Sequence, residues 1–137
     1  MVPKEKIVKP RVVLADDEEA VVALITRLLA PEFDIIASTE NGREAASLVL
    51  QQEPDLLVID IGLPVLHGMD VLALLRQKQS TTKVIFLSTF ADRRLSAGAL
   101  AAGASGFVFK CQLYTDLPKA LEAIMAGATF VSVEETR

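Results

Sequence analysis

The stretch that most constrains the fold is Leu56–Ile59, a run of consecutive apolar residues that ends on the carboxylate of Asp60. The turn-forming residues Gly62 and Pro64 follow at once. A short apolar run bounded by such residues is typical of a strand buried on both faces of a sheet. Ligands of open parallel α/β sheets bind beyond the carboxyl ends of the strands. The sequence therefore places Asp60 at a ligand-binding edge.

Other short apolar segments recur along the chain, separated by segments whose apolar residues have helical spacing. Strands that alternate with helices in this way form right-handed βαβ units. We therefore expect an α/β fold with a five-stranded parallel sheet and helices on both faces. The predicted strands are residues 12–15, 33–37, 56–59, 84–87 and 107–109. The predicted helices are residues 18–29, 43–52, 69–76, 93–102 and 115–126, the last with Pro118 in its first turn, and residues 130–137 are predicted to be a tail.

Composition narrows the classes of protein that fit the chain. With 137 residues, 51% of them hydrophobic and 23% charged, it suits one globular domain. A net charge of −4 and the lack of a Lys/Arg-rich block argue against nucleic-acid binding by this chain itself. The single cysteine, Cys111, permits no internal disulfide and fits a reducing cytosol, so we expect a cytoplasmic protein. No apolar run approaches the roughly 18 residues of a membrane span, so we expect no membrane attachment.

Four of the predicted strands end on a side chain that can take part in chemistry: the pair Asp16 and Asp17, then Asp60, Ser88 and Lys110. Because a parallel sheet brings the carboxyl ends of its strands to one edge, we expect these side chains to share a pocket. Neighbouring carboxylates repel one another unless a cation or a proton intervenes. Mg²⁺ prefers oxygen ligands and often binds one or two carboxylates together with phosphate oxygens. The sequence therefore predicts a magnesium site.

The remaining side chains favour a phosphoryl group as the ligand. Lys110 offers a positive charge, and Ser88 a hydroxyl, to phosphoryl oxygens. A carboxylate in this setting can attack phosphorus and become an aspartyl phosphate, and it needs no general base because it is already ionised. Each residue alone has an ordinary structural interpretation: Asp16 or Asp17 can cap a helix, and Asp60 can be a turn residue. Their combination at four strand ends favours the phosphoryl-binding interpretation.

The same positions give the chain a resemblance to a known family. Over about residues 9–127 it resembles the CheY-like receiver domain of bacterial two-component response regulators. The resemblance implies a flavodoxin-like, doubly wound sheet with the strand order 2-1-3-4-5. It rests on Asp16, Asp17, Asp60, Pro64, Gly68, Ser88 and the segment Gly103–Lys110.

The resemblance implies that Asp60 accepts a phosphoryl group from a sensor histidine kinase. It also implies that Mg²⁺ is bound by Asp17, Asp60 and the backbone carbonyl of Gly62, with Asp16 acting directly or through water. The protein would then be a signalling switch and not an enzyme.

The resemblance further implies that Lys110 binds the phosphoryl group and that Ser88 is the switch hydroxyl. Phe107 matches the switch aromatic that turns inward on activation, which is Tyr in many relatives. Thr89 and Phe90 stand where a small residue and a polar residue are frequent, and they are secondary candidates for shaping access to the phosphoryl group. The expected response is a shift of the surface formed by the fourth helix, fifth strand and fifth helix, with phosphorylation-dependent homodimerisation.

Cys111 takes the place of a proline that often follows the lysine, which leaves the isomer of the Lys110–Cys111 peptide open. The stretch Ala126–Ser132 resembles the exit into the linker of NarL/FixJ-type regulators, which carry a DNA-binding domain after the receiver. We favour a receiver cut from a longer regulator over a stand-alone receiver. We therefore divide the chain into a leader (1–9), a receiver domain (10–127) and the start of a linker (128–137) to an effector domain absent from this chain. DNA would be bound only through that domain.

Other functions fit the sequence less well. A pseudo-receiver, which mediates protein interactions without phosphorylation, usually lacks one of the key residues, and all of them are present here. A phosphatase with an aspartyl nucleophile has a second acid two residues on, where this chain has Gly62. A flavodoxin-type cofactor binder has a phosphate loop rich in Gly, Ser or Thr after its first strand, and this chain has none.

Overall fold

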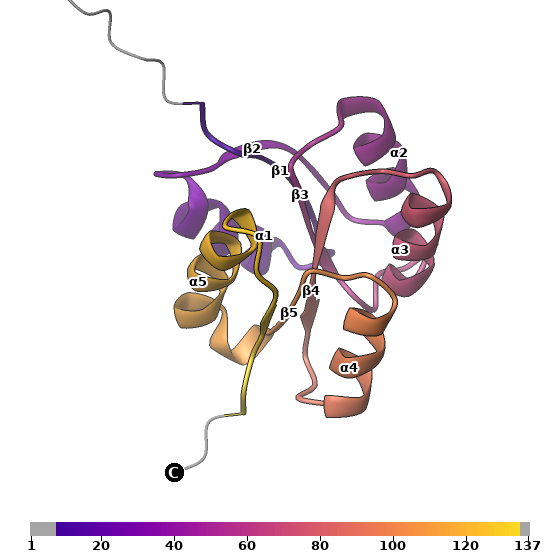
Figure 1. Ribbon diagram of the computed structural model, residues 1–137. Helices are drawn as coiled ribbons and strands as arrows, with labels where there is room; N and C mark the ends of the chain where they lie inside the picture. The colour runs from indigo at the N-terminus through magenta and orange to yellow at the C-terminus, as the bar shows by residue number, and fades with distance from the viewer. Residues whose placement is uncertain (1–7, 135–137) are drawn as a thin grey trace, which may run out of the picture.

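In the computed structural model, which describes residues 8–134, strands and helices alternate along the chain (Figure 1). The strands are paired in the order β2-β1-β3-β4-β5-β6, and every pair is parallel. The predicted α/β class and the order 2-1-3-4-5 are confirmed. The strands are β1 (Arg11–Ala15), β2 (Asp34–Thr39), β3 (Leu56–Asp60), β4 (Lys83–Ser88), β5 (Gly106–Phe109) and β6 (Phe130–Val131). The helices are α1 (Glu19–Leu29), α2 (Gly42–Gln52), α3 (Gly68–Gln77), α4 (Arg93–Ala101), α5 (Leu113–Met125) and the 3₁₀ turn η1 (Lys110–Gln112).

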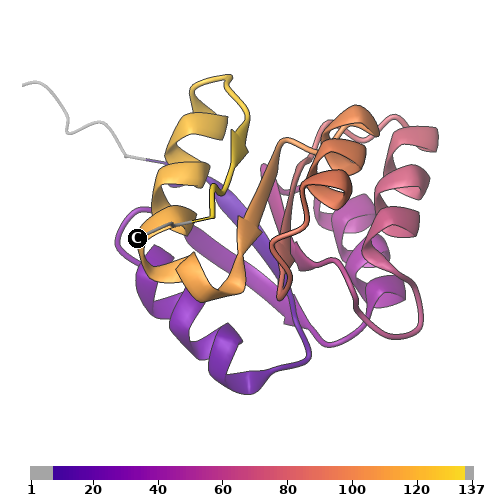
Figure 2. The ribbon, with the colours of Figure 1, turned by 90° about the horizontal axis from the view of Figure 1, so that it is seen from below.

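Helices cover both faces of the sheet, with α1 and α5 on one face and α2, α3 and α4 on the other (Figure 2). Alternate residues of each strand enter the two cores. Leu57 packs in the core that contains Leu72 of α3, whereas Val58 packs in the core that contains Leu121 of α5. Burial on both faces explains why the strands are unbroken apolar runs. None of the described helices combines the length and apolar character that a membrane crossing requires.

Parts of the predicted leader and of the predicted linker lie outside the described residues. These parts are residues 1–7 of the leader and residues 135–137 of the linker.

Helix α5 begins at Leu113, two residues before the predicted start at Thr115. The turn η1 runs directly into the helix, and Leu113 is buried with Leu117 on its apolar face. Pro118 therefore lies in the second turn of the helix, and its predicted place in the first turn is wrong. Residues 8–134 contain no cis peptide, so the Lys110–Cys111 bond is trans.

A sixth strand, β6, forms within the segment that was predicted to be a tail. It pairs in parallel with β5, so that Gly106 lies opposite Phe130 and Phe107 opposite Val131. A strand of two residues has too little periodicity to be recognised from its sequence. It forms because it pairs with the backbone groups that an edge strand otherwise leaves open.

The loop that follows Asp60 is held in a tight turn. The Leu66 N–H donates to the carbonyl of Pro64 at 2.8 Å across Val65, whose φ is 72°. An i to i+2 hydrogen bond across a residue with this φ is a γ-turn, a strained arrangement for a β-branched residue. The Gly42 N–H also donates to Pro64 O, at 3.2 Å, which ties the loop to the start of α2.

Gly68, the first residue of α3, closes the other end of this loop. Its N–H donates to the carbonyl of Ile61 at 2.8 Å. A Cβ added at Gly68 would lie 2.8 Å from Ile61 Cα and 2.9 Å from Phe86 Cε1. Only glycine allows the loop to approach the sheet this closely.

We predict opposite effects for the same substitution at two helical glycines. Gly68→Ala should lower the free energy of unfolding by about 1–3 kcal/mol, because its methyl group meets backbone and a buried ring. Gly98→Ala in α4 should raise it by about 1 kcal/mol, because nothing lies within 4 Å of the new Cβ and alanine favours helix. Urea unfolding measures both, and changes of the same sign would contradict the packing argument.

Candidate functional site

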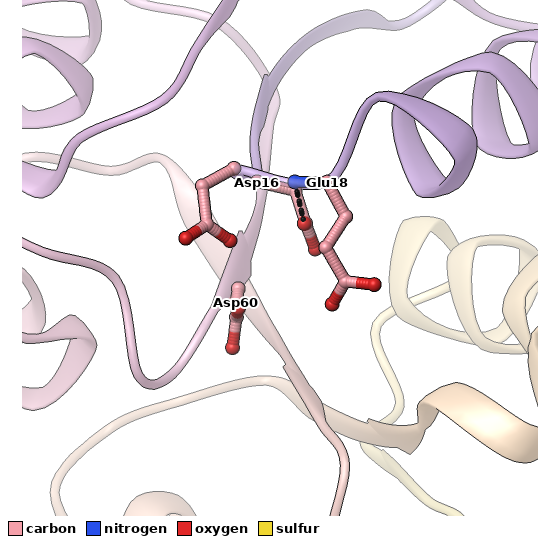
Figure 3. A group of neighbouring side chains, drawn as sticks. Asp16, Glu18 and Asp60 are labelled. Atoms are coloured by element: carbon pink, nitrogen blue, oxygen red, sulfur yellow. Dashed lines mark hydrogen bonds between the residues drawn. The ribbon is translucent and has the colours of Figure 1, made fainter.

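Four acidic side chains gather beyond the ends of two neighbouring strands. Asp16, Asp17 and Glu18 belong to the loop between β1 and α1, and Asp60 is the last residue of β3. Each offers an oxygen, and these oxygens all lie within 4.8 Å of one another. Figure 3 shows Asp16, Glu18 and Asp60, with the hydrogen bond of 2.9 Å that the Glu18 N–H donates to Asp16 Oδ1. The direct pairing of β1 with β3 brings these segments together.

Lys110 reaches this group of carboxylates from the turn after β5. Its Nζ lies 2.8 Å from Glu18 Oε1, 2.9 Å from Asp16 Oδ2 and 3.2 Å from Asp60 Oδ2. Burial by itself would lower the pKa of the Lys110 ammonium, but the hydrogen bonds to Glu18 and Asp16 and the nearby negative charges raise this pKa above its ordinary value. The ammonium is therefore fully charged at neutral pH.

Asp16 is the most buried member of the group, with a side chain that is 0% exposed. Burial raises the pKa of the Asp16 carboxyl, and hydrogen bonds from Lys110 and from the Glu18 N–H offset this only in part. Within the described residues, Asp16 Oδ2 makes no well-aligned hydrogen bond, and the ammonium 2.9 Å away compensates its charge. If all four acids are ionised, this single ammonium leaves an excess of three negative charges.

The carboxylate group fits a hard divalent cation. Its donors are all oxygens, they lie close together, and the buried Oδ2 of Asp16 makes no well-aligned hydrogen bond among the described residues. Asp16, Asp17, Glu18 and Asp60 are the described residues that could hold such an ion. Gly62 is tied to the site through its N–H, which donates to Asp60 Oδ1 at 3.1 Å. The predicted ligation by the Gly62 carbonyl stays a prediction.

Ser88 ends β4 near the same edge but is bound to its own loop. Its Oγ donates to the carbonyl of Phe90 at 3.0 Å and accepts the Phe90 N–H at 3.1 Å. The hydroxyl is therefore held by the backbone of the β4–α4 loop and not by the carboxylate group. Thr89 is exposed, and Phe90 is 73% exposed, so both residues face solvent.

Phe107 is fully buried in the core beneath α2, α3 and α4. It lies opposite Phe86 in the sheet and meets the ring of Phe109 edge to face, with centroids 6.2 Å apart. A tyrosine here would carry a hydroxyl that needs a partner, whereas phenylalanine has no polar atom to oppose burial. The inward position that was predicted for the activated protein is thus already occupied in this structure.

Glu18 is the member of the site that the sequence analysis did not identify. It makes the shortest of the three contacts to Lys110, at 2.8 Å, although its side chain is 57% exposed. The signal for it was the acidic run that continues from Asp17 through Glu18 to Glu19. Only the path of the loop decides which of these acids turns towards the lysine.

Residues 12–122 match the family model of the response regulator receiver domain. This range contains Asp16, Asp17, Asp60, Ser88, Phe107 and Lys110. The chain belongs to the response regulator receiver domain family. The predicted family is therefore confirmed, and the chain is a receiver domain of the kind found in two-component signalling.

Curated relatives of this receiver domain include proteins named as transcriptional regulators. The chain is 33% identical to the transcriptional regulatory protein LnrK of Bacillus subtilis over 92% of its own length and 58% of that protein. It is 33% identical to the Fimbriae Z protein of Escherichia coli K12 over 92% of its own length and 61% of that protein. The receiver domain thus spans less than two thirds of the length of these relatives.

Solved structures of response regulators also superpose on this receiver domain. The receiver domain of the putative response regulator NarL from Mycobacterium tuberculosis superposes with a TM-score of 0.83 at 27% identity, covering 88% of this chain and 99% of that one. A LuxR-family two-component response regulator from an Aurantimonas species gives a TM-score of 0.83 at 29% identity, covering 90% of this chain and 89% of that one. The predicted likeness to regulators of the NarL type is confirmed.

We predict that Asp16→Asn stabilises the metal-free protein at pH 7. Burial places the folded-state pKa of Asp16 above its ordinary value of 3.8, so the ionised side chain disfavours folding. This penalty is absent below the ordinary pKa and grows as the pH rises through the folded-state pKa. The gain in the free energy of unfolding should therefore shrink as the pH falls towards about 4. Urea unfolding in EDTA at a series of pH values tests this, and a pH-independent difference would contradict it.

Proposed function

We propose that the chain is a phosphorylation-controlled signalling switch in which Asp60 accepts a phosphoryl group from a histidine of a partner kinase. The contact of 3.2 Å between Asp60 Oδ2 and the Lys110 ammonium, at the carboxyl ends of the strands, supports this best. The Asp60 side chain is 15% exposed, whereas that of Asp16 is 0% exposed. Asp60 is thus the carboxylate of this pair that a phosphoryl donor can reach.

The surroundings of Asp60 suit an attack on phosphorus. The Gly62 N–H holds Oδ1, and the Lys110 ammonium lies beside Oδ2, so the carboxylate is oriented before a donor arrives. A carboxylate oxygen of Asp60 forms the new bond to phosphorus while the bond from phosphorus to the histidine nitrogen breaks, and the electron pair leaves with that nitrogen. The ammonium of Lys110 then pairs with the oxygens of the transferred group.

We propose Asp16, Asp17 and Asp60, together with the Gly62 carbonyl, as the residues that hold Mg²⁺. The excess of carboxylates over the single ammonium supports this assignment. When bound, a divalent cation supplies positive charge for phosphoryl oxygens that the carboxylates would otherwise repel. In its absence the Lys110 ammonium carries that task alone.

The response to phosphorylation is proposed to start at Ser88. Its hydroxyl would exchange its two hydrogen bonds with Phe90 for one to a phosphoryl oxygen, and the β4–α4 loop would follow. Helix α4, which contains Gly98 with open space around it, is suited to move. A shift of the α4–β5–α5 surface would then control homodimerisation and, through residues 128–137, an effector domain that binds DNA.

We propose residues 10–127 as the receiver domain and the cytoplasm as its compartment. The family match over residues 12–122 supports the domain limits.

We predict that incubation with acetyl phosphate and Mg²⁺ adds one phosphoryl group to the wild-type chain, detected by intact mass spectrometry. Asp60→Asn should gain none, because the nucleophilic oxygen is replaced by an amide nitrogen. Lys110→Met should gain less, because it removes the charge beside Asp60. The same samples on a size-exclusion column test the dimer. A wild-type chain that gains no mass would sink the proposal.

We predict that Mg²⁺ stabilises the fold through the carboxylate group. At a concentration 100-fold above the dissociation constant, a ligand of the folded state adds about 2.7 kcal/mol to the free energy of unfolding. Asp17→Asn should remove most of this gain, whereas Asp34→Asn, an exposed carboxylate on β2, should retain it. Thermal unfolding with and without Mg²⁺ measures the shift. A pseudo-receiver with an inactive site would show no Mg²⁺ dependence in any of the three proteins.

A further inference from the structure

The segment Phe130–Val133, which we call the clasp, is fastened along the open edge of β5. The Phe130 N–H donates to the carbonyl of Ser105 at 3.1 Å. The Ser132 N–H donates to the carbonyl of Phe107 at 2.8 Å. The clasp therefore lies beside β5 at the edge of the sheet, and β5 carries Phe107 and leads directly into Lys110.

Ser132 is the buried centre of the clasp, with 4% of its surface exposed. Its Oγ donates to Asp116 Oδ2 at 2.7 Å and accepts the N–H of Phe109 at 3.1 Å. Phe109 immediately precedes Lys110. Its N–H donates to the Ser132 side chain and not to the backbone of β6. Loss of the hydroxyl would remove the acceptor of the buried Phe109 N–H and one of the donors to Asp116 Oδ2.

Gln112 connects the clasp to the other side of Lys110. Its Nε2 donates to Asp116 Oδ2 at 2.7 Å and to the carbonyl of Val133 at 3.1 Å. Gln112 ends the turn η1, which starts at Lys110. The clasp thus bonds to the residue before Lys110 and to the turn after it.

The opposite side of the clasp faces open space. A groove of about 210 Å³ lies between the clasp and the start of α4. Arg93 and Ser96 line it from α4, and Val131 and Val133 line it from the clasp. The clasp is therefore bonded towards α5 and faces a groove towards α4.

We propose that the clasp, through Ser132, positions the turn that carries Lys110 and transmits the phosphorylation state of the site to the C-terminal segment. Lys110 sits between two hydrogen-bonded attachments to the clasp, so a displacement of the lysine towards a phosphoryl group pulls on both. Coupling of this kind is reciprocal, and a loosened clasp must also loosen the turn. Ser132 is a positioning residue in this proposal, and the transmission step rests on the proposed function.

Amide hydrogen exchange of the Mg²⁺-loaded protein, followed by NMR, tests the positioning step without phosphorylation. The readout is the Leu113 N–H, which donates to the carbonyl of Lys110 and not to the hydroxyl of Ser132. Ser132→Ala should speed its exchange about tenfold, which corresponds to the loss of one buried hydrogen bond. Val133→Ala, an exposed side chain that makes none of these bonds, should leave it unchanged. Equal exchange in Ser132→Ala and the wild type would overturn the proposal.

Gln112→Ala gives a second test, because it cuts only the attachment after Lys110 and leaves the buried serine in place. It should also speed exchange at the Leu113 N–H, and it serves as the test if Ser132→Ala does not fold. Unchanged exchange there would contradict the positioning role.

Acetyl phosphate separates transmission from the proposed function. In the wild type, phosphorylation should change amide exchange in residues 130–133. In the fraction of Ser132→Ala that carries a phosphoryl group, as identified by mass, these residues should show no such change. A wild type that is phosphorylated without a change in the clasp overturns the transmission step. A wild type that gains no phosphoryl group overturns the proposed function, while the Leu113 exchange still decides the positioning role.

Discussion

The contact of the Lys110 ammonium with three carboxylates is the interaction on which the rest of the site depends. Four acidic side chains within 4.8 Å of one another would not stay ionised together without a positive charge. The lysine lies after β5, and its partners lie after β1 and β3. A parallel sheet brings all the strand ends to the same edge, and the order of the strands decides which ends are neighbours. The neighbouring positions of these charges therefore depend on the strand order.

The sheet also divides the site between its two faces. Asp60 follows Val58 by two residues and Lys110 follows Val108 by two, and both valines pack against α1 and α5. Phe107 packs in the core on the other face, beneath α2, α3 and α4. Because successive residues of a strand point to opposite faces, a change at the carboxylates must cross the sheet to reach α4. Strand β5 contributes to both cores through Phe107 and Val108, and it leads into η1 and pairs with the clasp.

Most of the fold and of the site follows from local patterns, and the exceptions share a cause. The strands and the residues at their ends were predicted because buried runs that end on polar residues are a strong signal. Strand β6 was missed because its two residues form a strand only when β5 offers a free edge. The start of α5 was placed too late because Leu113 joins the helix through its burial against the sheet. Glu18 was missed because the sequence shows an acidic run but not the direction in which each acid points.

The sequence by itself determined the fold class, the receiver family and the identity of the strand-end residues, because hydrophobic periodicity and residue type are local properties. The tertiary structure decided how those residues are used. It placed the Ser88 hydroxyl on its own loop, buried Phe107 inward, and set Ser132 between Phe109 and Asp116. These outcomes depend on contacts between segments that are far apart in the chain. A hydrogen bond goes to whichever partner the packing brings within reach.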